Sequence, residues 1–89
     1  MSNGTAKPIR LSQHARGRLP SRGVTEAEIE QAIRTGSWRP AAGGRWETSK
    51  EFPFQAIWNG TWYPSKKVRP VFDELPAEIV VVTVYTFFF

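Results

Sequence analysis

The sequence predicts a small α+β domain in which two N-terminal helices pack on an antiparallel sheet of three to five strands. Apolar residues recur at helical spacing as far as Gly36, and short aromatic or β-branched runs separated by turn residues follow it. The 89 residues leave room for one hydrophobic core only. We therefore expect the polar, non-periodic residues 1–8 to form a flexible tail and residues 9–89 to form a single domain.

The first expected helix is short. Ser12 is a suitable N-cap for a helix that runs from Gln13 to about Leu19. Pro20 and Gly23 follow within four residues, and both residue types interrupt helices. We therefore expect barely two turns at this position.

The second helix has a stronger signal. Thr25 and Glu28 have the spacing of a capping box, and Gly36 is a suitable residue at the C-terminal end. These residues predict a helix from Glu26 to Thr35. Its apolar positions, which define one face toward the core, are Ile29, Ala32 and Ile33.

Strands are expected after Gly36, near residues 45–52, 54–58, 66–72 and 78–87. Asn59-Gly60 is a strong two-residue turn signal, so the runs on either side of it should pair as a hairpin. Pro70 cannot donate a ladder hydrogen bond, which predicts that its strand lies at an edge or is bulged there. The last strand is almost continuously apolar, which is typical of a central strand.

The composition excludes several classes of function. The chain has no cysteine and one histidine, so we expect no disulfide, no metal site and no cofactor. The first ten residues contain no apolar run of the kind found in signal peptides, and the longest apolar stretch, residues 79–89, is too short for a helical membrane span. We therefore expect a cytoplasmic protein or an effector delivered by another route. The net charge of +4 is arranged in two basic blocks, which suit RNA or DNA, although a solvated basic surface is the alternative.

His14 is the first candidate for chemistry, because its ordinary pKa lies near neutrality and proton transfer at physiological pH requires such a group. On a helix, His14 and Arg18 are four residues apart and therefore share a face. An imidazole beside a guanidinium is suited to a phosphodiester. The alternative is an ordinary surface histidine.

A second candidate lies in the last two strands. Alternation places Lys67 and Arg69 on one face of their strand, and it places Thr83 and Tyr85 on one face of the next, together with Val81 and Phe87. If the two polar rows meet across the ladder and face the His14 helix, they form a cleft with cations, a hydroxyl and a phenol. The alternative is that these side chains are solvated and only decorate the strands.

Four segments of the chain resemble a known family. They are the run Leu11-Ser12-Gln13-His14-Ala15-Arg16-Gly17-Arg18-Leu19, the run Arg22-Gly23-Val24-Thr25, residues 29–33 and the closing Ile79-Val80-Val81-Val82-Thr83-Val84-Tyr85. Together they resemble a family of small bacterial and phage domains of unknown function, whose pattern is an H-A-x-x-R helix, an R-G-[IV]-[ST] turn, a capped helix and a V-V-T-V-Y strand. That family is similar to BrnT-like toxins and to the superfamily of barnase, EndoU, colicin and RelE ribonucleases. The resemblance covers about residues 9–37 and 66–86.

The resemblance implies a metal-independent ribonuclease fold with one cleft between the helices and the sheet. The catalytic residues expected from it are His14, Arg18, Arg69, Thr83 and Tyr85. The substrate-binding residues expected beside them are Arg16, Arg22, Lys66, Lys67 and Trp46. Cleavage of this kind needs a base, an acid and cations, and the second proton-transfer role is left to Tyr85, Lys67 or Glu47.

We therefore expect an RNA-cleaving, toxin-like endoribonuclease that uses attack by the 2′-hydroxyl. One alternative is a non-catalytic module that binds RNA or single-stranded DNA through the same basic cleft and exposed tryptophans. Another is an immunity or interaction protein. The expected partners are RNA, a cognate antitoxin or immunity protein, and a second copy joined through the C-terminal strand, with no membrane partner.

The last strand runs into Phe87, Phe88 and Phe89. Alternation sends Phe87 and Phe89 to one face and Phe88 to the other, so at least one ring should leave the core unless helices cover both faces. Exposed rings favour aggregation. We therefore expect this end to be covered by the helices of the domain or by a partner.

Overall fold

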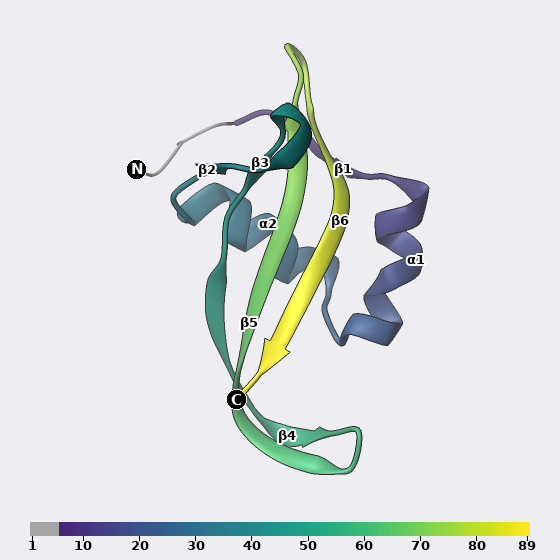
Figure 1. Ribbon diagram of the computed structural model, residues 1–89, viewed down its shortest axis with the longest axis vertical. Coiled ribbons are helices and arrows are strands. Elements are labelled where there is room, and N and C mark those ends of the chain that lie inside the picture. The colour runs from purple at the N-terminus through teal and green to yellow at the C-terminus, as the bar shows by residue number, and fades with distance from the viewer. Residues whose placement is uncertain (1–5) are drawn as a thin grey trace.

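The computed structural model describes residues 6–89, which form the expected α+β domain of two helices and a mostly antiparallel sheet (Figure 1). The helices are α1 (Gln13–Arg22) and α2 (Glu26–Thr35), and a 3-10 turn, η1 (Ala42–Gly44), follows them. The strands are β1 (Ile9–Leu11), β2 (Arg39–Pro40), β3 (Trp46–Glu47), β4 (Lys50–Trp58), β5 (Thr61–Glu74) and β6 (Ile79–Phe88). The sheet has more than the expected three to five strands, because β1 and β2 are too short to show an alternating pattern.

The sheet has the strand order β1-β6-β5-β3-β2, and β4 also pairs with β5. β1 runs parallel to β6, whereas every other neighbouring pair is antiparallel. The strands expected near residues 66–72 and 61–63 are one continuous β5 of 14 residues. β5 therefore has neighbours along both sides and organises the sheet.

Pro70 lies inside this central strand. Ser65 and Phe89 exchange both backbone hydrogen bonds, so the alternation of an antiparallel ladder turns the backbone nitrogen of Pro70 away from β6. On that side β3 has already ended at Glu47 and β4 begins at Lys50. The break between β3 and β4 is thus where the sheet accommodates a residue without an N–H group.

The two helices differ in how well local signals define them. α2 begins and ends where the sequence predicts, and its capping box is formed between Thr25 and Glu28. α1 is longer than predicted, because it continues through Pro20 to Arg22. A proline in the last turn removes only one helical hydrogen bond, and Gly23, with a φ of 63°, ends the helix in the left-handed conformation.

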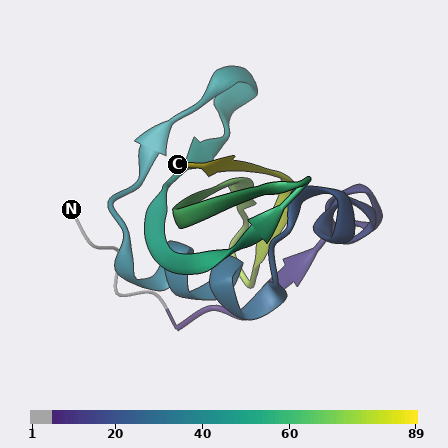
Figure 2. The same ribbon diagram turned by 90° about the horizontal axis from the view of Figure 1, so that it is seen from below.

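The hydrophobic core lies between the helices and one face of β5 and β6. In Figure 1, α2 lies behind these two strands and α1 stands beside β6; Figure 2 shows the same arrangement from below. From the helices, the fully buried residues are Ala15, Ile29, Ala32 and Ile33. From the strands, they include Val68, Phe72, Ile79, Val81 and Val84. Each large side chain of this set contributes roughly 1.5–3 kcal/mol by leaving water.

The hairpin of β4 and β5 extends past the rest of the sheet and curls at its tip (Figure 1). Asn59 and Gly60 both have positive φ, as the predicted two-residue turn requires. A second irregularity, at Gln55 with a φ of 49°, coincides with a bulge in β4. These two features bend the hairpin so that its rings reach the end of β6.

The aromatic rings of the hairpin surround Phe88. Trp58 stacks on Phe88 with 4.9 Å between ring centroids, Phe54 meets it edge-on at 4.9 Å, and Tyr63 lies at 5.7 Å. Gly23 sits directly beneath, since a Cβ atom there would come within 2.8 Å of Trp58. One of the three terminal rings is therefore covered by the domain itself, through the hairpin and not through a helix.

Residues 1–5 of the expected tail lie outside the described residues. Next to them, Lys7 and Pro8 are held against the sheet: the Lys7 Nζ donates to Glu74 at 3.0 Å, and the Ile79 amide donates to the Pro8 carbonyl at 2.9 Å. Two residues of the expected tail, Lys7 and Pro8, thus contact the domain. Neither of the two described helices is long and apolar enough to cross a membrane.

Candidate functional site

The face of β5 and β6 that points away from the helices carries the two polar rows expected from the sequence. We call it the open face and define it by Lys67, Arg69, Val71, Thr83, Tyr85 and Phe87. The rows meet across the ladder, because Arg69 lies opposite Tyr85 and Lys67 lies opposite Phe87. Neither α1 nor α2 lies in front of this face in Figure 1. The two polar rows therefore meet across the ladder as expected, but they lie on the face that points away from the helices, so the cleft expected between the helices and the sheet is not formed.

Val81 does not share this face, contrary to the expectation. The register of β5 and β6 shifts between the pairs Val71–Thr83 and Phe72–Val81, so one extra residue, Val82, is inserted into β6. An extra residue in one strand reverses the face of the sheet to which the preceding side chains of that strand point. Val81 consequently lies fully buried in the core with Phe72.

Two arginines flank Tyr85 at the centre of the open face. The guanidinium carbon of Arg22, at the end of α1, lies 5.8 Å from the centroid of the Tyr85 ring. That of Arg69, on β5, lies 4.9 Å from the centroid of the Phe87 ring. The Nε atoms of both arginines are buried and have no hydrogen-bond partner among residues 6–89. Both guanidinium groups thus lie beside aromatic rings at cation–π distance, and neither forms an ion pair among the described residues.

The ion pairs of the domain leave this part of the surface unneutralised. Seven of the eight carboxylates each pair with a different lysine or arginine, at distances of 2.8–3.5 Å. Five of the twelve cations then form no ion pair among the described residues. These are Arg18, Arg22, Lys50, Lys67 and Arg69. Arg22, Lys67 and Arg69 border Tyr85 and Phe87, and Arg18 lies one turn before Arg22, so the unpaired positive charge is concentrated here.

His14 lies at the other end of α1 from Arg22. His14, Arg18 and Arg22 follow one another at intervals of four residues, so they lie along one side of the helix. Eight residues of helix place His14 about 12 Å from Arg22 along the axis. The His14 and Arg18 side chains are both exposed.

α1 runs beside β6 in the same direction. The Ser12 amide donates to the Val81 carbonyl at 2.9 Å at one end, and Arg22 reaches Tyr85 at the other. His14 is therefore level with the Thr83 end of the open face, and Arg18 lies between the two ends. Arg22 therefore joins α1 to the open face, and His14 lies about 12 Å further back along the helix.

Three of the predicted substrate-binding residues lie elsewhere. Arg16 is on another side of α1 and pairs with Glu26 at 2.9 Å. Trp46 points to the helix side of the sheet and packs against Trp38, with 6.1 Å between ring centroids. Lys66 is 5% exposed, because it shares the core face of β5 with Val68. Glu47, one of the candidates for the second proton role, is paired with Arg39 at 3.1 Å.

Lys66 forms a salt bridge and a hydrogen bond inside the domain. Its Nζ donates to the Glu28 carboxylate and to the Gly23 carbonyl, both at 2.8 Å. Glu28 Oε1 also accepts from the Thr25 amide as part of the capping box. Lys66 therefore joins β5 to the start of α2 and does not reach the open face.

Phe87 lies on the open face with Thr83 and Tyr85, as alternation predicts, whereas Phe89 is expected only as an exposed ring at the chain end. Phe87 and Phe89 follow Tyr85 at intervals of two residues, so all three rings lie on one side of β6. Phe87, Phe89 and Tyr85 are 44%, 50% and 42% exposed, respectively. The same alternation extended by two residues adds Phe89 to this face.

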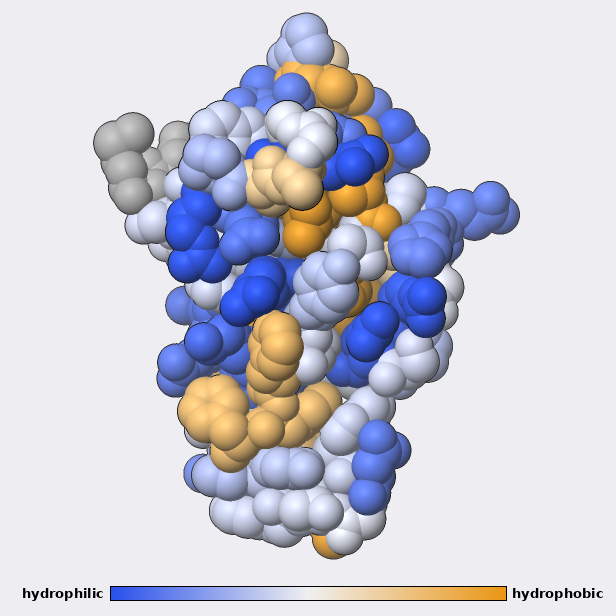
Figure 3. Space-filling model, in the orientation of Figure 1, coloured by the Kyte–Doolittle hydropathy of each residue, from blue (hydrophilic) through white to orange (hydrophobic). Residues whose placement is uncertain are grey.

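The hydrophobicity of the surface shows both features together. In Figure 3, drawn from the open side, hydrophobic atoms form a patch near the C-terminal end of β6, and strongly hydrophilic atoms border it. The exposed rings of Phe87 and Phe89 account for apolar surface in this region, and Lys67 and Arg69 account for charge. The open face is thus both aromatic and cationic.

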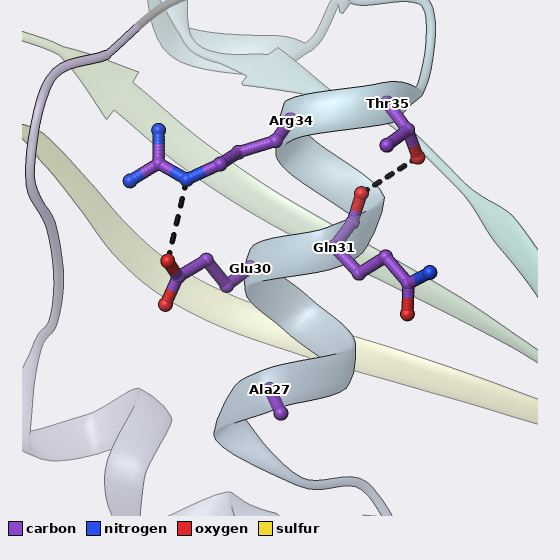
Figure 4. Close-up of a pocket in the computed structure, with 5 residues that line it drawn as sticks. All are labelled: Ala27, Glu30, Gln31, Arg34 and Thr35. Atoms are coloured by element: carbon purple, nitrogen blue, oxygen red, sulfur yellow. Dashed lines mark hydrogen bonds and ion pairs between the residues drawn. The ribbon is translucent and has the colours of Figure 1, made fainter.

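A shallow hollow on the outer surface of α2 does not offer a comparable site. It is lined by Ala27, Glu30, Gln31, Arg34 and Thr35 (Figure 4). Arg34 pairs with Glu30 at 3.3 Å, and the Thr35 hydroxyl donates to the Gln31 carbonyl at 2.7 Å. All five residues come from one helix, so no second element supplies a converging group.

Within residues 6–89 there is no group of three or more histidine, aspartate or glutamate side chains placed to hold a metal ion. Comparisons with protein-family models, with curated proteins and with solved structures give no match for this chain. The site is therefore interpreted from its own geometry and chemistry.

Proposed function

We propose that this domain is a metal-independent endoribonuclease of the toxin-like kind, acting on RNA bound at the open face. The observation that carries the proposal is the pair of arginines beside Tyr85, Arg22 and Arg69, neither of which forms an ion pair within residues 6–89. Guanidinium groups bind phosphate strongly, because charge-assisted hydrogen bonds to phosphate oxygens are short and often bidentate. RNA in the cytoplasm would be the natural substrate.

The reaction transfers the phosphorus from O5′ to O2′ of the same strand. The 2′-oxygen forms a bond to phosphorus as its proton passes to a base, and the bond to O5′ breaks as an acid protonates the leaving oxygen. The products are a 2′,3′-cyclic phosphate and a 5′-hydroxyl end. In our assignment His14 is the base and the Tyr85 phenol is the acid. Cleavage requires His14 and the bound RNA to come together at Tyr85, because His14 lies about 12 Å along α1 from Arg22, the residue that contacts Tyr85. Arg18, Arg22 and Arg69 stabilise the negative charge of the transition state, and Thr83 donates to a phosphate oxygen.

A second function is favoured by the surroundings of His14. No hydrogen bond or ion pair within the described residues orients the His14 ring. In a catalytic histidine, the ring nitrogen that does not act on the substrate usually donates a hydrogen bond to a carboxylate or carbonyl oxygen, which fixes the ring. A module that binds RNA or single-stranded DNA without cleaving it needs the cations and rings but not the histidine. In either case, a cognate antitoxin or immunity protein would inhibit by covering the open face.

Incubation of the purified full chain with total RNA in the presence of a chelator tests the two functions. We expect fragments with cyclic phosphate ends, lost in His14→Ala and in Arg69→Gln. Lys50→Gln is the matched control, because Lys50 is also an unpaired cation but lies on the other face of the sheet. Salt-dependent binding without cleavage would reject the nuclease and leave the binding module.

A further inference from the structure

We infer that the open face takes its nucleic acid as an unpaired strand, with bases stacked on the rings of Phe87 and Phe89 and phosphates along Arg69 and Lys67. The inference rests on the proposed function for the choice of nucleic acid as the ligand. It adds the form of that ligand and two residues that bind it. Neither phenylalanine has a role in the proposed cleavage step.

The three exposed rings form a regular row. Tyr85, Phe87 and Phe89 are alternate residues, and Phe89 continues the strand because it exchanges two backbone hydrogen bonds with Ser65, at 3.0 and 3.1 Å. Alternate residues of a strand are about 6.6–6.8 Å apart, and because the Arg69 guanidinium covers one face of the Phe87 ring, a base would stack on the other face. With 44–50% of each residue accessible, the Phe87 and Phe89 rings need no movement of the fold to be reached.

A row of cations runs beside the rings. Lys67 lies directly opposite Phe87 and Arg69 directly opposite Tyr85, so each cation neighbours one ring on the adjacent strand. Glu51 lies opposite Lys67 on β4, on the same face of the sheet, but forms no ion pair with it among the described residues. Alternating rings and cations match the alternating bases and phosphates of a single strand.

The rings also select against a duplex. In a base-paired helix the faces of the bases are stacked on one another, so a protein ring can contact only an unstacked base. The described part of the chain presents no helix from the open face that could enter a groove, because both helices pack elsewhere. Stacking on a sheet surface is the way in which small β-rich domains bind single strands.

Charge argues against a second copy of the chain as the occupant. Two open faces placed together would bring Arg22, Lys67 and Arg69 of one copy against the same residues of the other. These cations have no ion-pair partner among the described residues, and Glu51 is the one carboxylate there left without a partner. A phosphate chain supplies the missing negative charge, whereas a second copy adds to the repulsion.

Fluorescence anisotropy with a labelled 2′-O-methyl oligonucleotide tests the inference, since this probe lacks the 2′-hydroxyl and cannot be cleaved. We expect the single strand to bind at least about tenfold more tightly than a duplex of the same sequence. Phe87→Ala and Phe89→Ala should each weaken binding by roughly tenfold, which is the range for the loss of one stacked base. Trp62→Ala is the matched control, because Trp62 is 55% exposed on the hairpin, away from the open face.

Thermal unfolding of the same variants is the control for folding. We expect their melting temperatures to stay close to that of the wild type, because both rings are about half exposed. The inference is overturned if duplex and single strand bind equally, or if loss of either ring has no more effect than Trp62→Ala. It is also overturned if the wild type binds no oligonucleotide and instead forms a dimer that Phe87→Ala dissociates. Ring-dependent binding of the single strand together with a lack of cleavage would support this inference and reject the nuclease.

Discussion

The two faces of the β5 and β6 ladder differ sharply although they are built from neighbouring residues. On the helix side Val68, Phe72 and Val84 are completely buried. Arg69 follows Val68 and Tyr85 follows Val84, and both point to the open face. Arg69 has no ion-pair partner among the described residues. The covered face therefore supplies stability, and the open face is available for a ligand. A substitution should affect one property and spare the other.

The largest effect on stability should come from Phe72→Ala. Phe72 is fully buried and meets Trp38 edge-on at 4.9 Å, so its loss should lower the free energy of unfolding by about 3–5 kcal/mol. Phe87→Ala removes a ring of the same size from the open face and should cost less than about 1 kcal/mol. Urea unfolding followed by circular dichroism measures both. Similar losses in the two variants would show that the open face is part of the core.

Adjacent lysines on β5 provide a second comparison. Lys66→Met leaves the partly buried Glu28 carboxylate without its cation, which should cost about 2–4 kcal/mol. Lys67→Met removes a solvated charge from the open face and should leave stability nearly unchanged. Binding should show the reverse, with a reduced salt dependence for Lys67→Met. A stable Lys66→Met protein would mean that the tie between β5 and α2 contributes little.

A smaller effect is expected where the hairpin meets the helices. Gly23→Ala should lower stability by about 1–2 kcal/mol, because the residue has a φ of 63° and a Cβ atom would press on Trp58. Gly17→Ala is the control, since no atom lies within 4 Å of its Cβ position on α1. That substitution should raise stability by roughly 0.5–1 kcal/mol. Opposite signs of the two melting-temperature shifts are the expected result.

The smallest effect on stability is expected from the exposed ion pair of Arg10 and Glu78, next to the start of β6. Hydrogen bonds from Arg10 hold the pKa of the Glu78 carboxyl below its ordinary value. A carboxyl with a depressed pKa in the folded state adds stability above its unfolded pKa, and that stability is lost as the pH falls through its folded pKa. The wild type should therefore lose slightly more stability than Glu78→Gln between neutral pH and about pH 3. Parallel melting curves over this range would show that the pair does not contribute.

Local signals defined several elements correctly because they act over a few residues. The capping box of Thr25 and Glu28 fixes the start of α2, and Asn59-Gly60 fixes the hairpin turn. Alternation likewise put Lys67 and Arg69 on one face of β5, where they are observed. The end of α1 was missed because Pro20 interrupts helices in general but is tolerated in a last turn closed by glycine.

The α+β class, the second helix, the hairpin and the polar row on β5 can be predicted from the residues alone, because each depends on spacing within one segment. The parallel pairing of β1 with β6, the bulge at Val82 that turns Val81 inward and the contact of Arg22 with Tyr85 depend on how distant segments pack. Contacts between residues far apart in the chain depend on how the elements pack. The run Val80-Val81-Val82 gives no sign of a bulge, because its three side chains are identical. The face to which each valine points is therefore set by the pairing with β5.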